Sequence, residues 1–105
     1  MTTFDDREKA FENKFAHDEE MRFKAQARRN KLLGLWAAEL MGVTGAEAEA
    51  YAASVVASDL EEAGDEDVYR KVAADLTAKG VSIDALRPKM VELLAVAKAQ
   101  LMGEA

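Results

Sequence analysis

The stretch that decides the fold runs from residue 4 to residue 17, FDDREKAFENKFAH, and continues without proline to Met41. Thr3 is a candidate helix N-cap, and Asp5 and Asp6 place negative charge where the helix dipole favours it. One uninterrupted helix from Phe4 to Met41 would be about 57 Å long at ~1.5 Å per residue. A compact chain of ~100 residues has a radius of gyration of only about 13 Å. The segment is therefore too long to lie wholly on its own core.

Three phenylalanines mark the first part of this segment. Phe4, Phe11 and Phe15 are spaced by seven and then four residues, which places them on one stripe of a helix. Burying three Phe side chains is worth about 5–9 kcal/mol, which is less than the cost of ordering some 15 residues at ~1–2 kcal/mol each. We therefore expect residues 1–19 to form a protruding arm that is frayed or mobile when free and orders on a partner. The alternative is that the helix bends near residues 17–20 and folds the Phe stripe back onto the rest of the protein.

The remainder of the chain carries start and stop signals for a small helical domain. A second helix is expected from Thr44 towards Ala63, a third from Asp65 to Gly80, and a fourth from Ser82 or Asp84. Pro88 places the regular part of the fourth helix near that residue, because proline disrupts a helix interior. We predict an all-α protein: a four-helix bundle over residues 20–105, with a long first helix whose N-terminal part is the arm.

The first helix combines an apolar stripe with a basic run. Its core-facing stripe is predicted to include Leu33, Trp36 and Leu40, with Gly34 where another helix packs closely. The run from Arg22 to Lys31 contains all five bases of residues 22–42, a segment with a single acid. Residues 1–21, in contrast, hold seven acids and three bases. We interpret the run as a solvated face. Arg28 and Lys31 are the alternative candidates for contact with a phosphate or an acidic protein surface.

Little in the sequence indicates catalysis. One histidine and no cysteine leave no thiolate and make a zinc site or a Cys/His nucleophile pair unexpected. The acidic run from Asp59 to Asp67 lacks the spacing of a calcium loop and is expected to be a solvated loop and helix start. We therefore expect no enzyme activity, no metal and no cofactor. His17, at the junction of arm and bundle, is a candidate pH-sensitive hinge, with an ordinary exposed histidine as the alternative.

Charge and hydropathy also limit the partners. The net charge of −6 argues against nucleic acid. No apolar run of about 18 residues and no signal peptide are present, so we expect a cytoplasmic protein without direct membrane insertion. We expect it to be monomeric when free.

Three segments carry a resemblance to a known family: residues 4–10 (FDDREKA), 14–18 (KFAHD) and above all 28–38 (RRNKLLGLWAA). They resemble the zeta subunits of alphaproteobacterial F-type ATP synthases, and the similarity extends over essentially the whole chain. The resemblance implies a four-helix protein whose N-terminal segment, from about Thr2 to Ala16, inhibits ATP hydrolysis by the catalytic head, as the mitochondrial inhibitor protein does. It also implies that the partners are the catalytic-head subunits, with the bound protein at the cytoplasmic face of the inner membrane.

With this resemblance, individual residues of the arm can be given expected roles. A poorly ordered amphipathic arm enters a catalytic interface of the head and folds there, while the bundle docks outside and raises its effective concentration. Phe4, Phe11 and Phe15 are the expected anchors, and register is set by Asp5, Asp6, Arg7, Glu8, Lys9 and Glu12. Two alternatives remain open: a helical adaptor without inhibitory activity of its own, and a weak nucleotide-binding bundle that uses Arg28 and Lys31.

Overall fold

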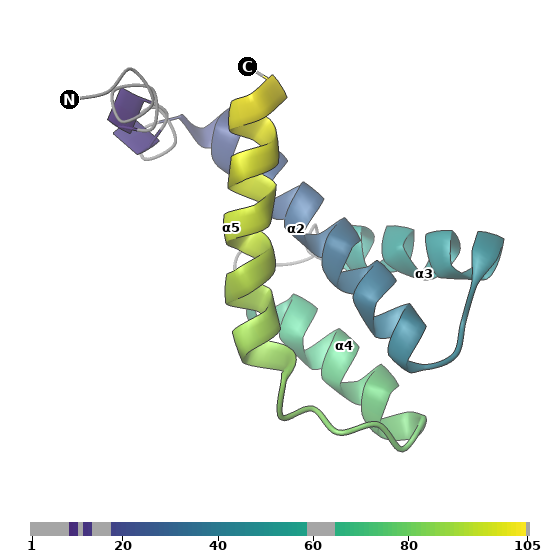
Figure 1. The fold of residues 1–105 in the computed structure, drawn as a ribbon. Helices are drawn as coiled ribbons and strands as arrows, with labels where there is room; N and C mark the ends of the chain where they lie inside the picture. The colour runs from purple at the N-terminus through teal and green to yellow at the C-terminus, as the bar shows by residue number, and fades with distance from the viewer. Residues whose placement is uncertain (1–8, 11, 14–17, 59–64, 105) are drawn as a thin grey trace.

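The computed structural model describes residues 9, 10, 12, 13, 18–58 and 65–104. This part of the chain contains four long helices and no strand (Figure 1): α2 (Glu19–Leu40), α3 (Gly45–Ser58), α4 (Glu66–Ala78) and α5 (Leu86–Glu104). The predicted all-α, four-helix fold is confirmed. The predicted continuation of the second helix to Ala63 lies outside the described residues.

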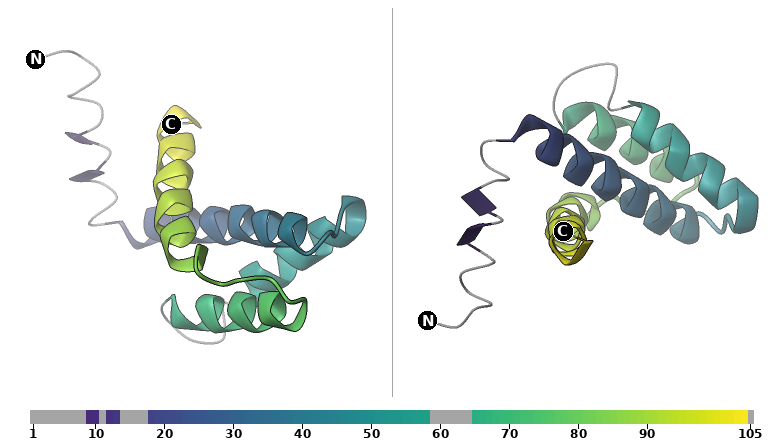
Figure 2. Two further views of the ribbon diagram at one scale, coloured as in Figure 1. Left: turned by 60° about the horizontal axis from the view of Figure 1, so that its bottom comes forward. Right: turned by 90° about the horizontal axis from the view of Figure 1, so that it is seen from above.

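Helix α2 is the central element of the fold. It contacts α3, α4 and α5. Helix α3 returns alongside α2, whereas α5 crosses α2 steeply (Figure 2). Because of this crossing, the last turns of α5 lie against the first turns of α2, and the first turns of α5 lie near α4.

The main core lies where all four helices meet. Its buried members are Leu33, Ala37, Val55, Val68, Val72, Leu76, Leu86 and Met90. Val68, Val72 and Leu76, which recur at intervals of four residues in α4, are all fully buried. Trp36 is partly buried against this core. Leu40 is 44% exposed, contrary to the prediction, because the helix ends there and Met41 packs on the core instead.

A second, smaller cluster joins the beginning of α2 to the end of α5. Ala25 and Leu101 are its buried members, and Met21, Leu94 and Met102 pack against it. This cluster has far fewer buried side chains than the main core, so the two ends of the fold differ in how much apolar surface holds them.

Gly34 is the point of closest approach between α2 and α3. A Cβ added to Gly34 would lie 2.6 Å from the Cα of Ala52 and 3.1 Å from its Cβ. Only a residue without a side chain permits this backbone contact, so the predicted packing role of Gly34 is confirmed.

The helix ends follow local signals. Helix α2 begins at Asp18, an extended residue (φ −111°, ψ 106°) whose carboxylate accepts a hydrogen bond of 3.1 Å from the Met21 N–H. It closes at Gly42, which has a φ of +76°. Helix α5 begins at Leu86, two residues before the predicted start, and this puts Pro88 in the first turn, where no intrahelical N–H bond is lost.

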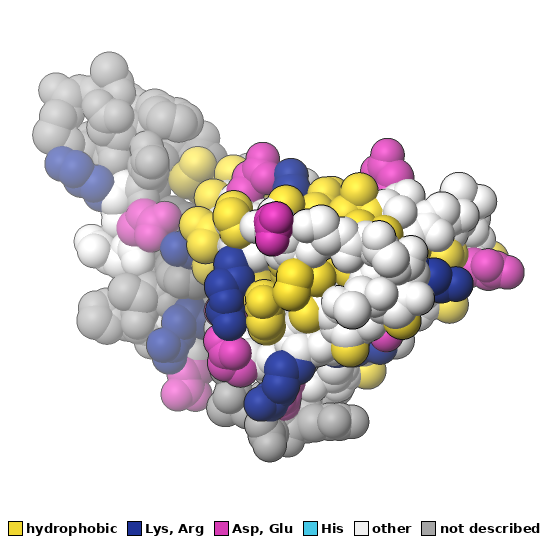
Figure 3. All heavy atoms as spheres, turned by 90° about the horizontal axis from the view of Figure 1, so that it is seen from below, with side chains coloured by type: hydrophobic (Ala, Val, Ile, Leu, Met, Phe, Trp, Pro, Cys, Tyr) yellow, Lys and Arg dark blue, Asp and Glu magenta, His cyan; other side chains and the backbone are white. Residues whose placement is uncertain are grey.

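The surface also retains much apolar area. On the face seen from below, hydrophobic side chains form a patch with Lys, Arg, Asp and Glu side chains around it (Figure 3). More than half of the surface of a small folded protein is contributed by apolar atoms, so such a patch alone marks no binding site.

Candidate partner-binding surfaces

The predicted arm is only partly within the described residues. Lys9 and Glu12 are described and exposed, as are their neighbours Ala10 and Asn13. The other predicted arm residues lie outside the described residues, and so does the proposed hinge: Phe4, Asp5, Asp6, Arg7, Glu8, Phe11, Phe15 and His17. Their roles, and the alternative of a folded-back Phe stripe, therefore stay predictions.

Glu12 brings the arm into contact with the last helix. Its Oε2 lies 3.9 Å from the Nζ of Lys98 on α5. A groove of about 390 Å³ surrounds this pair, and we call it the α5 groove; its lining residues are Glu12, Val91, Leu94, Ala95, Lys98, Ala99 and Met102. The α5 residues recur at intervals of three and four, which places them on one face of the helix. The arm thus supplies one wall of a mostly apolar groove.

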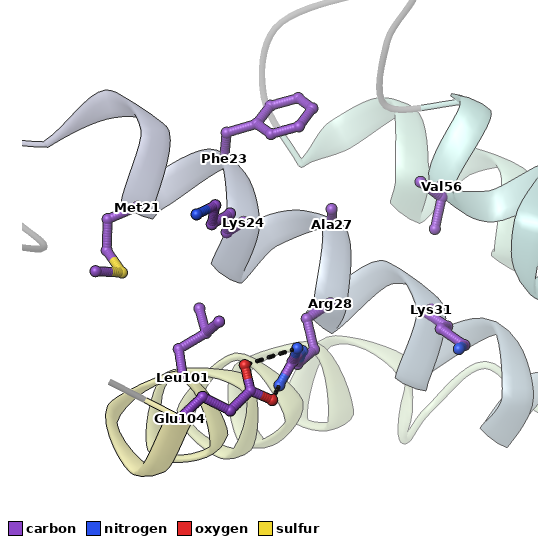
Figure 4. Close-up of a pocket in the computed structure, with 9 residues that line it drawn as sticks. All are labelled: Met21, Phe23, Lys24, Ala27, Arg28, Lys31, Val56, Leu101 and Glu104. Atoms are coloured by element: carbon purple, nitrogen blue, oxygen red, sulfur yellow. Dashed lines mark hydrogen bonds and ion pairs between the residues drawn. The ribbon is translucent and has the colours of Figure 1, made fainter.

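A second groove follows the basic run on α2. Lys24, Arg28 and Lys31 recur at helical spacing and face a hollow of about 750 Å³ between α2, α3 and α5 (Figure 4). Phe23 lines it too and is 56% exposed. The structure therefore brings Arg28 and Lys31, the two predicted anion-contact residues, to one groove, which we call the α2 groove.

Most of the positive charge in the α2 groove already has an acidic partner. The Arg28 guanidinium makes two hydrogen bonds to the Glu104 carboxylate, one of them 3.1 Å long from Nη2 to Oε2. These hydrogen bonds hold the pKa of the Glu104 carboxyl below its ordinary value. Lys24 lies 3.4 Å from Glu20 in the same helix. A phosphate that bound Arg28 would have to displace a carboxylate.

Arg29 is a buried charged residue whose position the sequence analysis did not predict. It is 1% exposed, with its Nη2 donating to Asp65 at 2.8 Å and its Nε donating to the Asn30 Oδ1 at 2.7 Å. Asn30 is fully buried, and its Nδ2 has no hydrogen-bond partner among the described residues. The prediction of a solvated face from Arg22 to Lys31 is therefore wrong at these two positions.

The spacing along α2 held a signal for this burial. Arg29 lies four residues after Ala25 and four before Leu33, and both of these neighbours are fully buried. Arg28, one residue earlier, points about 100° away around the helix and stays at the surface. A helical projection centred on the alanine and leucine residues would have placed Arg29 on the core face.

The described residues give no evidence of a metal site or of a membrane-spanning segment. No group of three or more His, Asp or Glu side chains in this part of the chain is arranged to hold a metal ion. None of its helices combines the length and hydropathy needed to cross a bilayer.

Comparison with known proteins identifies the family. Residues 1–100 match the family model described as ATPase inhibitor subunit zeta. This chain belongs to the ATPase inhibitor subunit zeta family. No curated protein matches the chain. A solution NMR structure of a protein with 60% sequence identity to this zeta-family chain matches it with a TM-score of 0.72, over 81% of this chain and 99% of that one.

The match assigns the protein a regulatory class. It spans nearly the whole zeta-family chain, including the predicted arm as well as the four helices. The role of this family is inhibition of an ATPase. The surface that does the inhibiting, and the subunits that it meets, are matters for proposal.

Proposed function

We propose that this zeta-family chain inhibits ATP hydrolysis by inserting its arm, residues 1–19, into a catalytic interface of the F-type ATP synthase head. The observation that carries the proposal is the helix start at Asp18. The α2 helix has its own N-cap there, and the described members of both core clusters all come from α2–α5 and the segments that join them. The arm is therefore left for another role, and the family match includes it.

The side chains of the arm suit such a role. In a helical arm, Phe4, Phe11 and Phe15 form one apolar stripe that fits a hydrophobic groove between subunits. The exposed Lys9 and Glu12 fit a role in setting orientation, because rim charges contribute more to specificity and association rate than to affinity. Wedged at the interface, the helix blocks the conformational cycling that hydrolysis needs.

The bundle then serves as an anchor. It docks outside the catalytic interface and raises the local concentration of the arm, so the intact chain inhibits more strongly than the isolated arm. In this assembly the protein is a non-enzymatic subunit at the cytoplasmic face of the membrane, and it is monomeric when free.

The experiment compares three molecules in an ATPase assay with the isolated catalytic head. A peptide of residues 1–19 inhibits, the full chain inhibits at lower concentration, and a chain that begins at Asp18 folds but does not inhibit. This truncation keeps the capping carboxylate, so loss of the first turn of α2 cannot explain the result. The matched control is the peptide with Phe11→Ser and Phe15→Ser, which loses most of its activity. Inhibition by the truncated chain equal to that of the full chain would contradict the proposal.

A nucleotide-binding bundle is the second candidate, and the α2 groove is the observation in its favour. The pairing of Arg28 with Glu104 weighs against it. Titration with ATP while the backbone amides of Lys24, Arg28 and Lys31 are followed by NMR decides, because a real site produces saturable shifts at all three.

A further inference from the structure

We infer that the α5 groove is the resting site of this chain's own arm, so that the Phe stripe lies on α5 in the free protein and must leave it to reach a partner. The docking itself is a property of the isolated chain. Only its effect on inhibition rests on the proposed function.

The first argument is the contact that the described residues already make. Glu12 is separated from α5 by most of the sequence, yet its carboxylate reaches Lys98 and its side chain lines the groove. Residues 9–10 and 12–13 lie beside α5 in the two views of Figure 2. The arm is thus on the side of the molecule where the groove opens.

The second argument is the apolar character of the groove. Val91 is 73% exposed. Leu94 and Met102 pack against the small cluster of Ala25 and Leu101 on one side and line the groove on the other. A phenyl ring placed in the groove would therefore add to the small cluster of Ala25 and Leu101. It would also cover apolar surface that α5 leaves exposed.

The third argument is register. On a helix, Glu12 lies about 100° from Phe11 and about 60° from Phe15, so an arm that turns Glu12 towards Lys98 carries the Phe stripe on the adjoining flank. From Phe4 to Phe15 is eleven residues, about 16 Å of helix, and the groove from Val91 to Met102 also spans eleven residues of α5. The length of the stripe matches the length of the groove.

Charge favours the same occupant. The support is local: the Glu12 carboxylate lies near Lys98, the charged α5 residue that lines the groove, whereas residues 1–17 as a whole carry four acids and three bases. The Glu12 side chain is about half exposed, so the ion pair is a weak contact that orients the arm while the apolar surfaces hold it. Such docking is readily reversed, as an arm with a second binding site requires.

Direct observation of the docked arm is the first test. In the isolated full chain, the ring protons of Phe11 or Phe15 are expected to give NOEs to the methyl groups of Leu94 and Met102. Ala95→Asp, in the middle of the groove, abolishes these NOEs because it places a charged carboxylate on the apolar surface that the phenyl rings would cover. Gln100→Asp, an exposed position on another flank of the same helix, leaves them unchanged and is the matched control. Absence of the NOEs in the parent chain overturns the inference.

Charge exchange tests the register. Glu12→Lys alone weakens the NOEs by up to about fivefold, the range expected for an exposed ion pair. Combination with Lys98→Glu restores them. Failure of the double exchange to restore them contradicts the placement of Glu12 over Lys98. NOEs seen only between differently labelled copies in a mixed sample would assign the groove to a second molecule and overturn self-docking.

Inhibition separates this inference from the proposed function. If the arm is shared between the two sites, Ala95→Asp releases it, and the chain inhibits the catalytic head at a severalfold lower concentration than either the parent or Gln100→Asp. Unchanged inhibition would contradict competition. Docking NOEs in a chain that never inhibits would leave the self-docking standing and refute the proposed function alone.

Discussion

At the scale of single residues, Gly34 fixes the distance between α2 and α3. We expect Gly34→Ala to lower the free energy of unfolding by about 1–3 kcal/mol, as overpacked sites do, although alanine is the better helix former. The added Cβ would meet the backbone of Ala52, which cannot rotate away. Denaturation by urea measures the change.

Gly103→Ala is the matched control for this substitution. Gly103 also lies in a helix, and a Cβ there would meet nothing within 4 Å. It should be neutral or stabilising by up to about 1 kcal/mol. Equal stabilities of the two variants would contradict the close approach of the helices.

The buried charge of Arg29 makes Asp65 a second sensitive residue. Removing one partner of a buried ion pair commonly costs about 3–5 kcal/mol. Because the Asp65 side chain is half exposed, water still screens the pair, and we expect Asp65→Asn to cost about 1–3 kcal/mol. Thermal and urea unfolding measure it.

Glu66→Gln serves for comparison at the neighbouring position. Glu66 pairs with Arg87 at 3.1 Å, but both side chains of that pair are mostly exposed. It should change stability much less than Asp65→Asn does. If the two variants lose the same free energy of unfolding, the Arg29 guanidinium is better solvated than its burial indicates.

At the scale of helices, the beginning of α2 depends on one carboxylate. Loss of an N-cap side chain typically costs about 0.5–2 kcal/mol. We therefore expect Asp18→Ala to destabilise the protein by that amount. It should also speed hydrogen exchange at the Met21 N–H, which donates its hydrogen bond to the Asp18 carboxylate. Asp18→Asn keeps a side-chain oxygen in the same place and should retain most of the stability. Equal exchange rates in the two variants would show that the cap is dispensable.

The helices that were predicted correctly from the sequence owe this to local signals. The third helix, predicted from Asp65 to Gly80, matches α4 because its start and stop signals lie within a few neighbouring residues. The cap at Asp18 is equally local, but it was not predicted, since Thr3 was the N-cap candidate for the first helix. Leu40 was assigned to the core wrongly because its exposure depends on where the chain turns at Met41. Pro88 was read as a barrier, whereas the first turn of a helix tolerates it.

Contacts between distant residues explain what the sequence did not predict. Arg29 is buried because Asp65, 36 residues later, comes to rest beside it at the beginning of α4. The α5 groove exists because α5 crosses α2 and leaves the face of Val91 uncovered. The spacing along α2 signals that Arg29 faces the core, but neither its pairing with Asp65 nor the uncovered face of α5 has a signature in a short window of sequence.

At the scale of the whole molecule, stability should be uneven. The main core draws on all four helices, whereas the cluster at the end of α5 has two buried residues in the described part of the chain, Ala25 and Leu101. We expect native-state hydrogen exchange to show the highest protection at Val72 and Leu76 in α4, and lower protection in the last two turns of α5, which open without global unfolding. Equal protection of both regions would indicate that the molecule opens only as a single unit.

The independent start of α2 has a consequence for protein engineering. A helix that supplies its own first-turn acceptor at Asp18 does not need any given sequence ahead of it in order to fold. An unrelated peptide can therefore be fused to the bundle in place of the residues ahead of Asp18. The fused peptide would leave the bundle at a fixed point beside the end of α5. Under the proposed function, exchange of residues 1–17 between zeta-family chains would transfer inhibitory strength and leave the four helices unchanged.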